Sequence, residues 1–114
     1  MSGLEGTGDS MVTPPLTVEI TANADATRVT AVGEIDLDTK GELEKTLMDL
    51  CKDQRRLELD LSGVSFIDST GLGVLLSARN LCAESGGMLT LHAPSEHVRR
   101  TFETAGLSAA FILE

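Results

Sequence analysis

Five short apolar stretches, each bounded by turn residues, have the length and pattern of β-strands. In the first of them, Val18 and Ile20 share one face, which is typical of a half-buried strand. The turn-like residues 23–26 follow directly, so the first two strands are expected to form an antiparallel hairpin. The predicted strands cover residues 17–21, 28–35, 55–61, 88–91 and 110–113.

Three other stretches carry apolar residues at the spacing of an α-helix. Thr39 and Glu42 have the spacing of a capping box, and the helix that they open reaches Cys51. The second helix is predicted over residues 69–84. The third begins after Ser95, its expected N-cap.

The second predicted helix is apolar around most of its circumference. Such a helix is either deeply buried or presents part of its apolar surface to a partner. We expect Leu72, Leu76 and their neighbours to form a contact surface of this kind. Residues 62–68, which lead into the helix, carry isolated apolar side chains and are predicted to form a loop.

The elements therefore follow the order β-β-α-β-α-β-α-β. Strands that alternate with helices imply right-handed crossovers and a mixed, mostly parallel sheet with helices packed against it. The hairpin places the first strand at one edge of that sheet. The 114 residues suit one α/β domain, which we assign to residues 16–114. Residues 1–15, rich in Gly, Ser, Thr and Pro, are predicted to form a flexible tail.

The chain is strongly acidic, with 18 Asp and Glu residues, 9 Lys and Arg residues and a formal net charge of -9. A surface with this charge repels nucleic acid backbones and anionic lipids, so we expect neither nucleic acid nor membrane as a partner. The sequence has no apolar run of the roughly 18 residues that a membrane span needs, and its first residues do not resemble a signal peptide. The expected location is the cytoplasm.

Cys51 and Cys82 are the two cysteines of the chain. They are too few and too far apart for a zinc site or a CxxC redox motif, and both fall in predicted helices. We therefore expect buried, free thiols that behave as small hydrophobic side chains. No disulfide framework is expected in a chain without an export signal, and no metal site or cofactor is predicted.

Polar residues follow two of the predicted parallel strands at their carboxyl ends, where ligands gather in open parallel sheets. If those strands are neighbours, Asp36, Asp68 and Ser69 meet at one edge of the sheet. Ser69 stands at the start of the second helix, where free N–H groups and the helix dipole favour an anion. An N-cap is also a sufficient reason for Ser at this position, and each Asp alone is typical of a turn.

Gly71 and Gly73 lie in the first turns of the same helix, although each costs roughly 1 kcal/mol relative to Ala. Glycine at this place lets another molecule approach the backbone, or lets the helix pack tightly on the sheet. The sequence leaves both explanations open. A phosphate on Ser69 would add about −1.5 to −2 charges beside Asp36 and Asp68, and their repulsion would keep it on the surface.

Residues 59–75, LDLSGVSFIDSTGLGVL, closely resemble the signature of the STAS domain, in particular that of bacterial anti-sigma factor antagonists. The string GEID at residues 33–36 resembles an earlier motif of that family. Two later glycine-containing motifs, at residues 86–87 and 102–107, fall where the family has them. The resemblance covers residues 16–114 and implies a single STAS-like domain.

The resemblance also implies a function. In such antagonists the unphosphorylated form binds an anti-sigma factor that is itself a serine/threonine kinase, and a sigma factor is released. Phosphorylation of the serine after the motif's aspartate abolishes this binding, and a PP2C-type phosphatase resets the switch. The implied acceptor is Ser69, with Thr70 as a second hydroxyl and Asp36 and Asp68 as flanking acids. No enzymatic activity is implied for the chain itself. The residues implied in partner binding are Gly71, Leu72, Gly73 and Leu76.

One position departs from the family pattern. After Asp36 many relatives have a Thr-Ala pair that leads into the helix, whereas here Thr39 is followed by Lys40. The added positive charge near the acidic residues is a candidate determinant of which kinase is recognised. It does not affect the acceptor.

Other functions remain open from the sequence. A STAS domain that is never phosphorylated would act as a scaffold or regulatory subunit, because Ser69 permits phosphorylation but does not prove it. A receiver-type phosphoacceptor domain would use Asp36, Asp38 and Asp68 around Mg²⁺. Such a domain also needs a lysine late in the sheet, and the chain has none after Lys52.

Two further alternatives have weaker support. A nucleotide-binding module is suggested by the Gly-x-Gly pair at residues 71–73, although Leu76 occupies the position of the third Gly. A serine hydrolase would need a base and an oxyanion site near Ser69, and the first Gly of the nucleophile-elbow motif is missing. Folding could bring His92 or His97 near, but each is better explained as a surface or capping residue.

Overall fold

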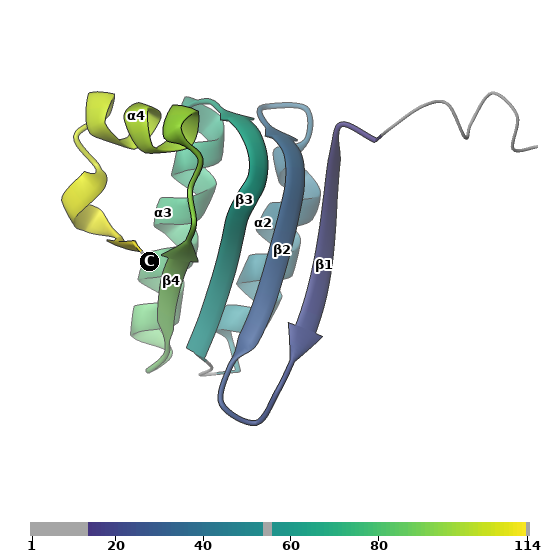
Figure 1. Ribbon diagram of the computed structural model, residues 1–114. Helices are drawn as coiled ribbons and strands as arrows, with labels where there is room; N and C mark the ends of the chain where they lie inside the picture. Colours follow the sequence, from purple (N-terminus) through teal and green to yellow (C-terminus); the bar gives the residue numbers. More distant parts are fainter. Residues whose placement is uncertain (1–13, 54–55, 114) are drawn as a thin grey trace, which may run out of the picture.

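The computed structural model describes residues 14–53 and 56–113 as a five-stranded mixed sheet with helices packed against it (Figure 1). The elements are β1 (Leu16–Ala22), β2 (Thr27–Ile35), α2 (Lys40–Cys51), β3 (Arg56–Ile67), α3 (Ser69–Glu84), β4 (Met88–His92), α4 (Glu96–Thr104), the short 3-10 helix η1 (Ser108–Ala110) and β5 (Ile112–Leu113). The strands lie in the order β1-β2-β3-β4-β5. β1 is antiparallel to β2, and the other neighbouring strands are parallel. The predicted α/β class and the order of elements are therefore confirmed.

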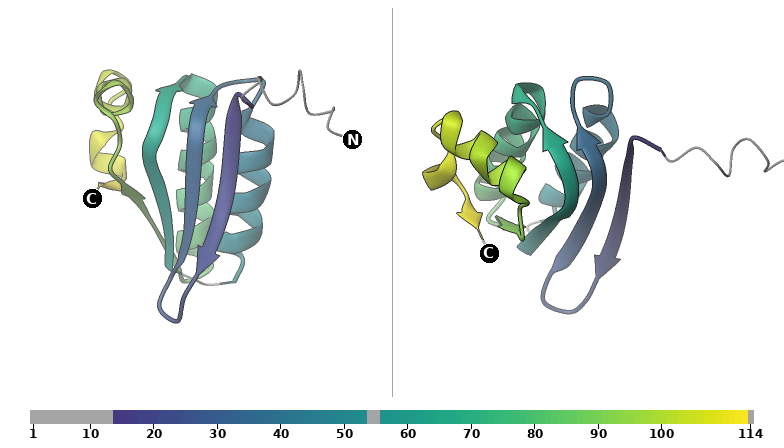
Figure 2. Two further views of the ribbon diagram at one scale, coloured as in Figure 1. Left: turned by 45° about the vertical axis from the view of Figure 1, so that its right-hand side comes forward. Right: turned by 45° about the horizontal axis from the view of Figure 1, so that its top comes forward.

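Two helices lie side by side against one face of the sheet (Figures 1 and 2). These are α2 and α3, whereas α4 lies beside the carboxyl ends of β3 and β4. Strands covered by helices bury aliphatic side chains, and the core between the sheet and the α2–α3 pair follows this rule. The largest fully buried side chains are Phe102, Ile35, Leu43, Leu47, Leu57, Leu59, Leu61, Ile67, Leu75, Leu91, Val29 and Val64.

Strand β3 is longer than the sequence pattern predicts. It extends to Ile67, so the loop expected over residues 62–68 is wrong. The register against β2 shifts between Thr30 and Val32 and again after Gly33, and β3 accommodates an extra residue at each shift. These bulges change the spacing of buried residues from two to three, which hides the strand from a search for strict alternation. The buried residues of β3 are Leu57, Leu59, Leu61, Val64 and Ile67. The predicted start at residue 55 lies outside the described residues.

The predicted hairpin of β1 and β2 is confirmed, but β1 is less buried than expected. The Asn23 side-chain oxygen accepts hydrogen bonds from the backbone N–H groups of Asp25 and Ala26, both at 2.9 Å, and closes the turn. Val18 is half-buried, while Ile20 keeps 55% of its surface exposed. Because β1 is the edge strand, its inner face lies at the margin of the helical layer, and the prediction of a half-buried Ile20 is wrong.

The last residue of the predicted tail is tied to the sheet. The Glu34 backbone N–H donates to the Pro15 carbonyl at an N···O distance of 2.8 Å. This approach requires Gly33, whose φ of 124° disfavours other residues and whose Cβ, if present, would strike the Pro15 carbonyl. Residues 1–13 of the tail predicted at residues 1–15 lie outside the described residues.

The start of α2 differs from the predicted capping box. Thr39 is the N-cap residue, yet its hydroxyl makes no hydrogen bond to a helix N–H. Instead, Thr39 Oγ1 accepts from the Asp36 backbone N–H at 2.9 Å and donates to the Glu34 carbonyl at 2.8 Å. The Thr39–Glu42 capping box is therefore wrong, because the Thr39 hydroxyl holds the end of β2 rather than the helix.

Helices α3 and α4 begin where the sequence predicts. α3 covers residues 69–84, as expected. Ser95 caps α4, since its Oγ accepts from the Val98 N–H at 3.3 Å and also donates to the Val64 carbonyl of β3 at 3.0 Å. The cap thus attaches α4 to the sheet. Across the described ranges, no helix combines the length and apolarity that crossing a membrane requires.

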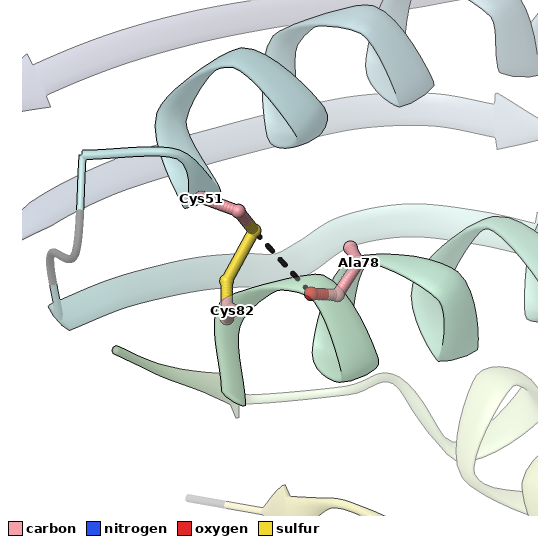
Figure 3. The surroundings of a disulfide bond; sticks show 3 residues. All are labelled: Cys51, Ala78 and Cys82. Atoms are coloured by element: carbon pink, nitrogen blue, oxygen red, sulfur yellow. Dashed lines mark hydrogen bonds between the residues drawn. A yellow bond between two sulfur atoms is a disulfide. The ribbon is translucent and has the colours of Figure 1, made fainter. Parts of the chain in front are cut away.

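Cys51 and Cys82 form a disulfide bond that joins the end of α2 to α3 (Figure 3). Their Cα atoms are 4.6 Å apart, and the exposed fractions are 1% and 0%. The prediction of burial is confirmed, whereas the prediction of free thiols is wrong. The residues lie 31 positions apart, and only the packing of α2 on α3 brings them together.

Gly71→Ala is expected to destabilise the domain, although Ala favours a helix by about 1 kcal/mol over Gly. A Cβ at position 71 would lie 2.7 Å from a carbon of Ile35 and 2.7 Å from a carbon of Ile67. Both isoleucines are fully buried and have little freedom to move. We expect a net loss of about 1–2 kcal/mol in the free energy of unfolding, measured by urea denaturation.

Gly73→Ala is the matched control, because a Cβ at position 73 meets nothing within 4 Å. This substitution should raise the free energy of unfolding by up to about 1 kcal/mol. Effects of the same sign and size at both positions would contradict the packing role of Gly71.

Candidate functional site

The carboxyl ends of β2 and β3 lie side by side, as the hypothesis for the site requires. Ile35 and Ile67 are register partners, and the Asp68 backbone N–H donates to the Ile35 carbonyl at 3.1 Å. Asp36 and Asp68 each follow directly, so the structure brings both to the same edge of the sheet. Helix α3 begins at this edge with Ser69.

Asp68 caps helix α3. Its Oδ1 accepts hydrogen bonds from the Gly71 backbone N–H at 3.0 Å and from the Thr70 hydroxyl at 2.5 Å. The Thr70 hydroxyl is the main cause that lowers the pKa of Asp68, with burial opposing it and the backbone N–H groups of Gly71, Thr70 and Leu37 adding to it. The site thus keeps a charged carboxylate at the helix N-terminus, where an external anion would otherwise be attracted.

Ser69 is exposed at the first position of α3. The alternative in which Ser69 is the N-cap is wrong, because Asp68 has this role. Among the described residues, none makes a hydrogen bond to the Ser69 hydroxyl, whereas the half-buried Thr70 donates its hydroxyl to Asp68. Ser69 is therefore the more accessible of the two hydroxyls.

Asp36 organises the turn between β2 and α2. Its Oδ1 accepts from the backbone N–H groups of Asp38 at 3.0 Å and Thr39 at 3.1 Å. These bonds account for Asp36 as a turn residue, an explanation that the sequence left open. Lys40 follows this turn, and its Nζ lies 3.6 Å from the Glu44 carboxylate of the same helix. The lysine that departs from the family pattern is thus paired along α2.

A groove of about 310 Å³ opens between the start of α3 and helix α4. Ser69 and Leu72 line it on the α3 side. The His97 ring stacks on Phe66 of β3, with ring centroids 5.4 Å apart, and this contact helps to hold α4 in place. The sequence pattern did not place α4 beside Ser69, because the order of elements does not fix where the last helix packs. The groove is completed by His97, Arg100, Thr101, Thr104 and Ala105.

The four residues implied in partner binding are not equally accessible. Gly71 is buried against the sheet, and Leu72 is only 5% exposed. Gly73 is exposed and Leu76 is half-buried. Tight packing of the helix on the sheet therefore explains Gly71. At Gly73 the helix backbone is exposed, so another molecule can approach it.

Two apolar side chains near this edge were missed by the sequence analysis. Leu37 is 66% exposed in the turn after β2, and Phe66 is 38% exposed near the end of β3. The sequence carried one signal for Leu37, because it is an apolar residue directly after Asp36 in a turn, where polar residues are usual. Single exposed apolar side chains are common, whereas an apolar patch surrounded by polar residues marks a contact surface, so these two side chains are candidates for one.

The described residues offer the Ser69 hydroxyl no hydrogen-bonded base. His97 lines the same groove but stacks on Phe66, and His92 ends β4 with its Nε2 3.2 Å from Thr90 Oγ1. In the same part of the chain, no three His, Cys, Asp or Glu residues are grouped so that they could hold a metal ion. The geometry of a serine hydrolase is not met among these residues.

Asp68→Ala is expected to lower the free energy of unfolding at pH 7 by about 0.5–2 kcal/mol, the usual cost of losing an N-cap. The folded state lowers the pKa of Asp68 below its usual 3.8, so the carboxylate stabilises the fold above that pH. This contribution is lost as the pH falls through the lower, folded value. Urea denaturation at a series of pH values should therefore show the two proteins converging below 3.8.

Asp68→Asn is the control for this prediction, because it keeps a capping acceptor without the charge. It should retain most of the stability at pH 7. A difference between wild type and Asp68→Ala that stays constant down to the lowest pH would contradict the role given to the Asp68 carboxylate.

The comparisons with known proteins agree with this geometry. The family described as "Mlab, STAS domain" matches residues 18–114. The anti-sigma-B factor antagonist of Bacillus subtilis is 34% identical over 92 residues, which are 81% of this chain and 84% of that protein.

Solved structures show the same likeness. An anti-sigma factor antagonist from Mycobacterium paratuberculosis superimposes with a TM-score of 0.77 and 28% identity over 86% of this chain and 84% of that chain. The anti-sigma factor antagonist SpoIIAA in its unphosphorylated form gives a TM-score of 0.72 over 86% of this chain and 88% of its own. At 19% identity, that second likeness concerns the fold alone. The family match, the B. subtilis relative and the shared fold together confirm the resemblance read from residues 59–75, and the chain belongs to the STAS-domain family of anti-sigma factor antagonists.

Proposed function

We propose that the chain is an anti-sigma factor antagonist that works as a phosphorylation-controlled partner switch. Its unphosphorylated form binds an anti-sigma factor serine/threonine kinase and so releases a sigma factor, and phosphorylation of Ser69 ends this binding. The observation that carries the proposal is the exposed Ser69 hydroxyl at the first position of α3, beside the paired ends of β2 and β3. The role of the relatives as antagonists supports the same function.

The contacts of the two neighbouring hydroxyls favour Ser69 over Thr70 as the acceptor. A kinase must reach the hydroxyl oxygen, and Ser69 is exposed without a described hydrogen bond to give up. Thr70 is half-buried and donates to the capping carboxylate of Asp68. Modification of Thr70 would break that bond and weaken the cap of α3, so Thr70 is at most a second site.

The charges around Ser69 predict what a phosphate does there. It adds about −1.5 to −2 charges at a helix N-terminus, where the dipole alone would favour it by about 0.3–1 kcal/mol. The Asp68 carboxylate already accepts the hydrogen bond of the Gly71 N–H, and Asp36 lies at the same edge of the sheet. Repulsion from the acids therefore offsets the attraction of the helix. The phosphate stays on the surface and leaves the fold unchanged.

The partner surface that we propose combines Ser69, the groove beside it and Leu37. The groove is lined mainly by side chains of α3 and α4, and Leu37 offers a large exposed apolar side chain at the same edge. A few residues supply most of the affinity of a protein interface, and we propose Leu37 as one of them. A doubly charged phosphate in the middle of such a contact would be desolvated, which costs several kcal/mol, and Arg100 of the groove is already paired with Glu96. The phosphorylated form therefore no longer binds the kinase.

The remaining parts of the switch follow from this chemistry. A phosphoserine ester is stable in water, so resetting the antagonist requires a phosphatase, which we propose to be of the PP2C type. The role of the chain itself is regulatory, and it requires no cofactor. Because sigma factors act on transcription, we place the antagonist in the cytoplasm.

Ser69→Ala should bind the cognate kinase persistently, whereas Ser69→Glu should bind it at least about tenfold more weakly. Neither substitution removes the helix cap, because Asp68 provides it. The free energy of unfolding of both variants should therefore lie within about 0.5 kcal/mol of the wild-type value. Candidate anti-sigma kinases are incubated with the protein and ATP, the phosphosite is mapped by mass spectrometry, and affinities are measured by titration calorimetry.

Thr70→Ala serves as the control for the mapping, because it keeps Ser69 and should still be phosphorylated. Phosphate found only on Thr70 would contradict the assignment of the acceptor. A complex with the kinase but no phosphorylation of any residue would favour the alternative of a STAS scaffold or regulatory subunit.

Leu37→Lys should weaken binding of the unphosphorylated protein to the same kinase at least about tenfold, or about 1.4 kcal/mol. Because Leu37 is 66% exposed, the free energy of unfolding should change little. Leu72 is less suitable for this test, since at 5% exposure a lysine there would damage the core.

Met88→Lys is the matched control, because Met88 is also apolar and exposed (45%) but opens β4 at the opposite end of the sheet (Figure 1). It should leave the affinity unchanged. Unaltered binding by Leu37→Lys, or an equal loss in both variants, would argue against the proposed surface.

A further inference from the structure

The Cys51–Cys82 bond lies in the core between the two helices that cover the sheet (Figure 3). Cys51 is the last residue of α2, and Cys82 lies in the last turn of α3. The position suits a reduced pair as well, because Cys51 Sγ lies 3.3 Å from the Ala78 carbonyl oxygen. A thiol proton on Cys51 would be donated to that oxygen, while the disulfide has no proton to donate. Both oxidation states therefore fit the same core.

We propose that Cys51 and Cys82 are a reversible thiol/disulfide pair that sets the stability of the domain according to the redox state of its surroundings. The inference rests on the proposed function to the extent that this function places the chain in the cytoplasm. Disulfides are rare there, and those that occur are usually redox-responsive rather than permanent. A buried disulfide between two helices of a cytoplasmic regulator is thus a candidate modification site.

The oxidant that fits is a low-molecular-weight disulfide. The Cys51 thiolate attacks one sulfur of that molecule, forms a mixed disulfide and releases one thiol. The Cys82 thiolate then attacks Cys51 Sγ, closes the protein disulfide and releases the second thiol. The two protons lost by the cysteines end on the two released thiols, and two electrons pass to the small disulfide. Reduction by an excess of the small thiol follows the same steps in reverse.

Access to the pair is through the end of α2. Both cysteines are fully buried, so neither reacts while the helix is intact. Cys51 is followed by the exposed Lys52 and Asp53, and helix ends open more readily than helix centres. Unwinding of the last turn of α2 exposes Cys51 first, while Cys82 stays in α3 and is placed to close the bond. Exchange is therefore slow and limited by local opening.

The cross-link encloses residues 51–82, which include all of β3 and the start of α3 with Ser69. Closing a loop of this length restricts the unfolded chain and stabilises the folded one. Ser69 lies roughly 20 Å away along α3, so the bond does not alter the partner surface directly. Oxidation raises the fraction of folded, binding-competent antagonist near the temperature at which the reduced form melts.

The test uses the full chain equilibrated with mixtures of reduced and oxidised glutathione. Free thiols are trapped with a maleimide and counted by mass spectrometry, and thermal unfolding is followed by circular dichroism. We expect two labelled thiols per chain in fully reduced glutathione and none in fully oxidised glutathione. Reduction of the oxidised protein should restore both thiols. The Tm of the oxidised form should be higher by an amount on the order of 10 °C.

The double variant Cys51→Ala/Cys82→Ala is the control, and its Tm should be the same at both ends of the series. If this variant does not fold, wild type with and without a phosphine reductant provides the same comparison. Two free thiols throughout the series, a disulfide that persists in fully reduced glutathione, or equal Tm values in both states would overturn the proposal. No kinase takes part in these measurements, so their failure leaves the function of Ser69 untouched. A failure of the Ser69 experiments would remove the argument from location but would not alter the thiol counts or the Tm values.

Discussion

The site depends on the parallel pairing of β2 and β3 up to their last residues, Ile35 and Ile67. Two bulges in β3 absorb its extra residues, so both strands end at the same level of the sheet. Gly71 packs against the same two isoleucines, and its missing Cβ lets α3 begin directly at this edge. Without this pairing, Asp36 and Asp68 would belong to separate loops, and the serine after Asp68 would have no defined surroundings.

The capping of α3 explains why the domain is suited to a switch of charge rather than of conformation. A helix N-terminus usually attracts a phosphate because its N–H groups are free. Here Asp68 accepts the Gly71 N–H and the Thr70 hydroxyl, so a carboxylate already caps the helix before any modification. A phosphate on Ser69 finds no bond that the fold needs, and its charge acts outward on whatever contacts that surface.

Local patterns in the sequence predicted the helices and the position of Asp68 and Ser69 between a strand and a helix. Both depend on the spacing of residues that are close together in the chain. They failed for β3, where the register against β2 rather than alternation decides which residues are buried. They did not indicate that Leu37 is exposed or that Leu72 is only 5% exposed, since exposure depends on where α2 and α4 pack. The Cys51–Cys82 bond was missed for the same reason, because it requires α2 to lie against α3.

Helix α3 connects the two modifications that we propose. At its first residue a phosphate changes surface charge without a change in the fold, since Asp68 already provides the cap. Near its other end Cys82 joins α2 through a bond that is fully buried, and a buried bond changes stability without a change in the surface. The two modifications therefore do not compete. In the switch that we propose, charge at Ser69 decides whether a folded molecule binds its partner, and the proposed redox pair sets what fraction of the molecules is folded.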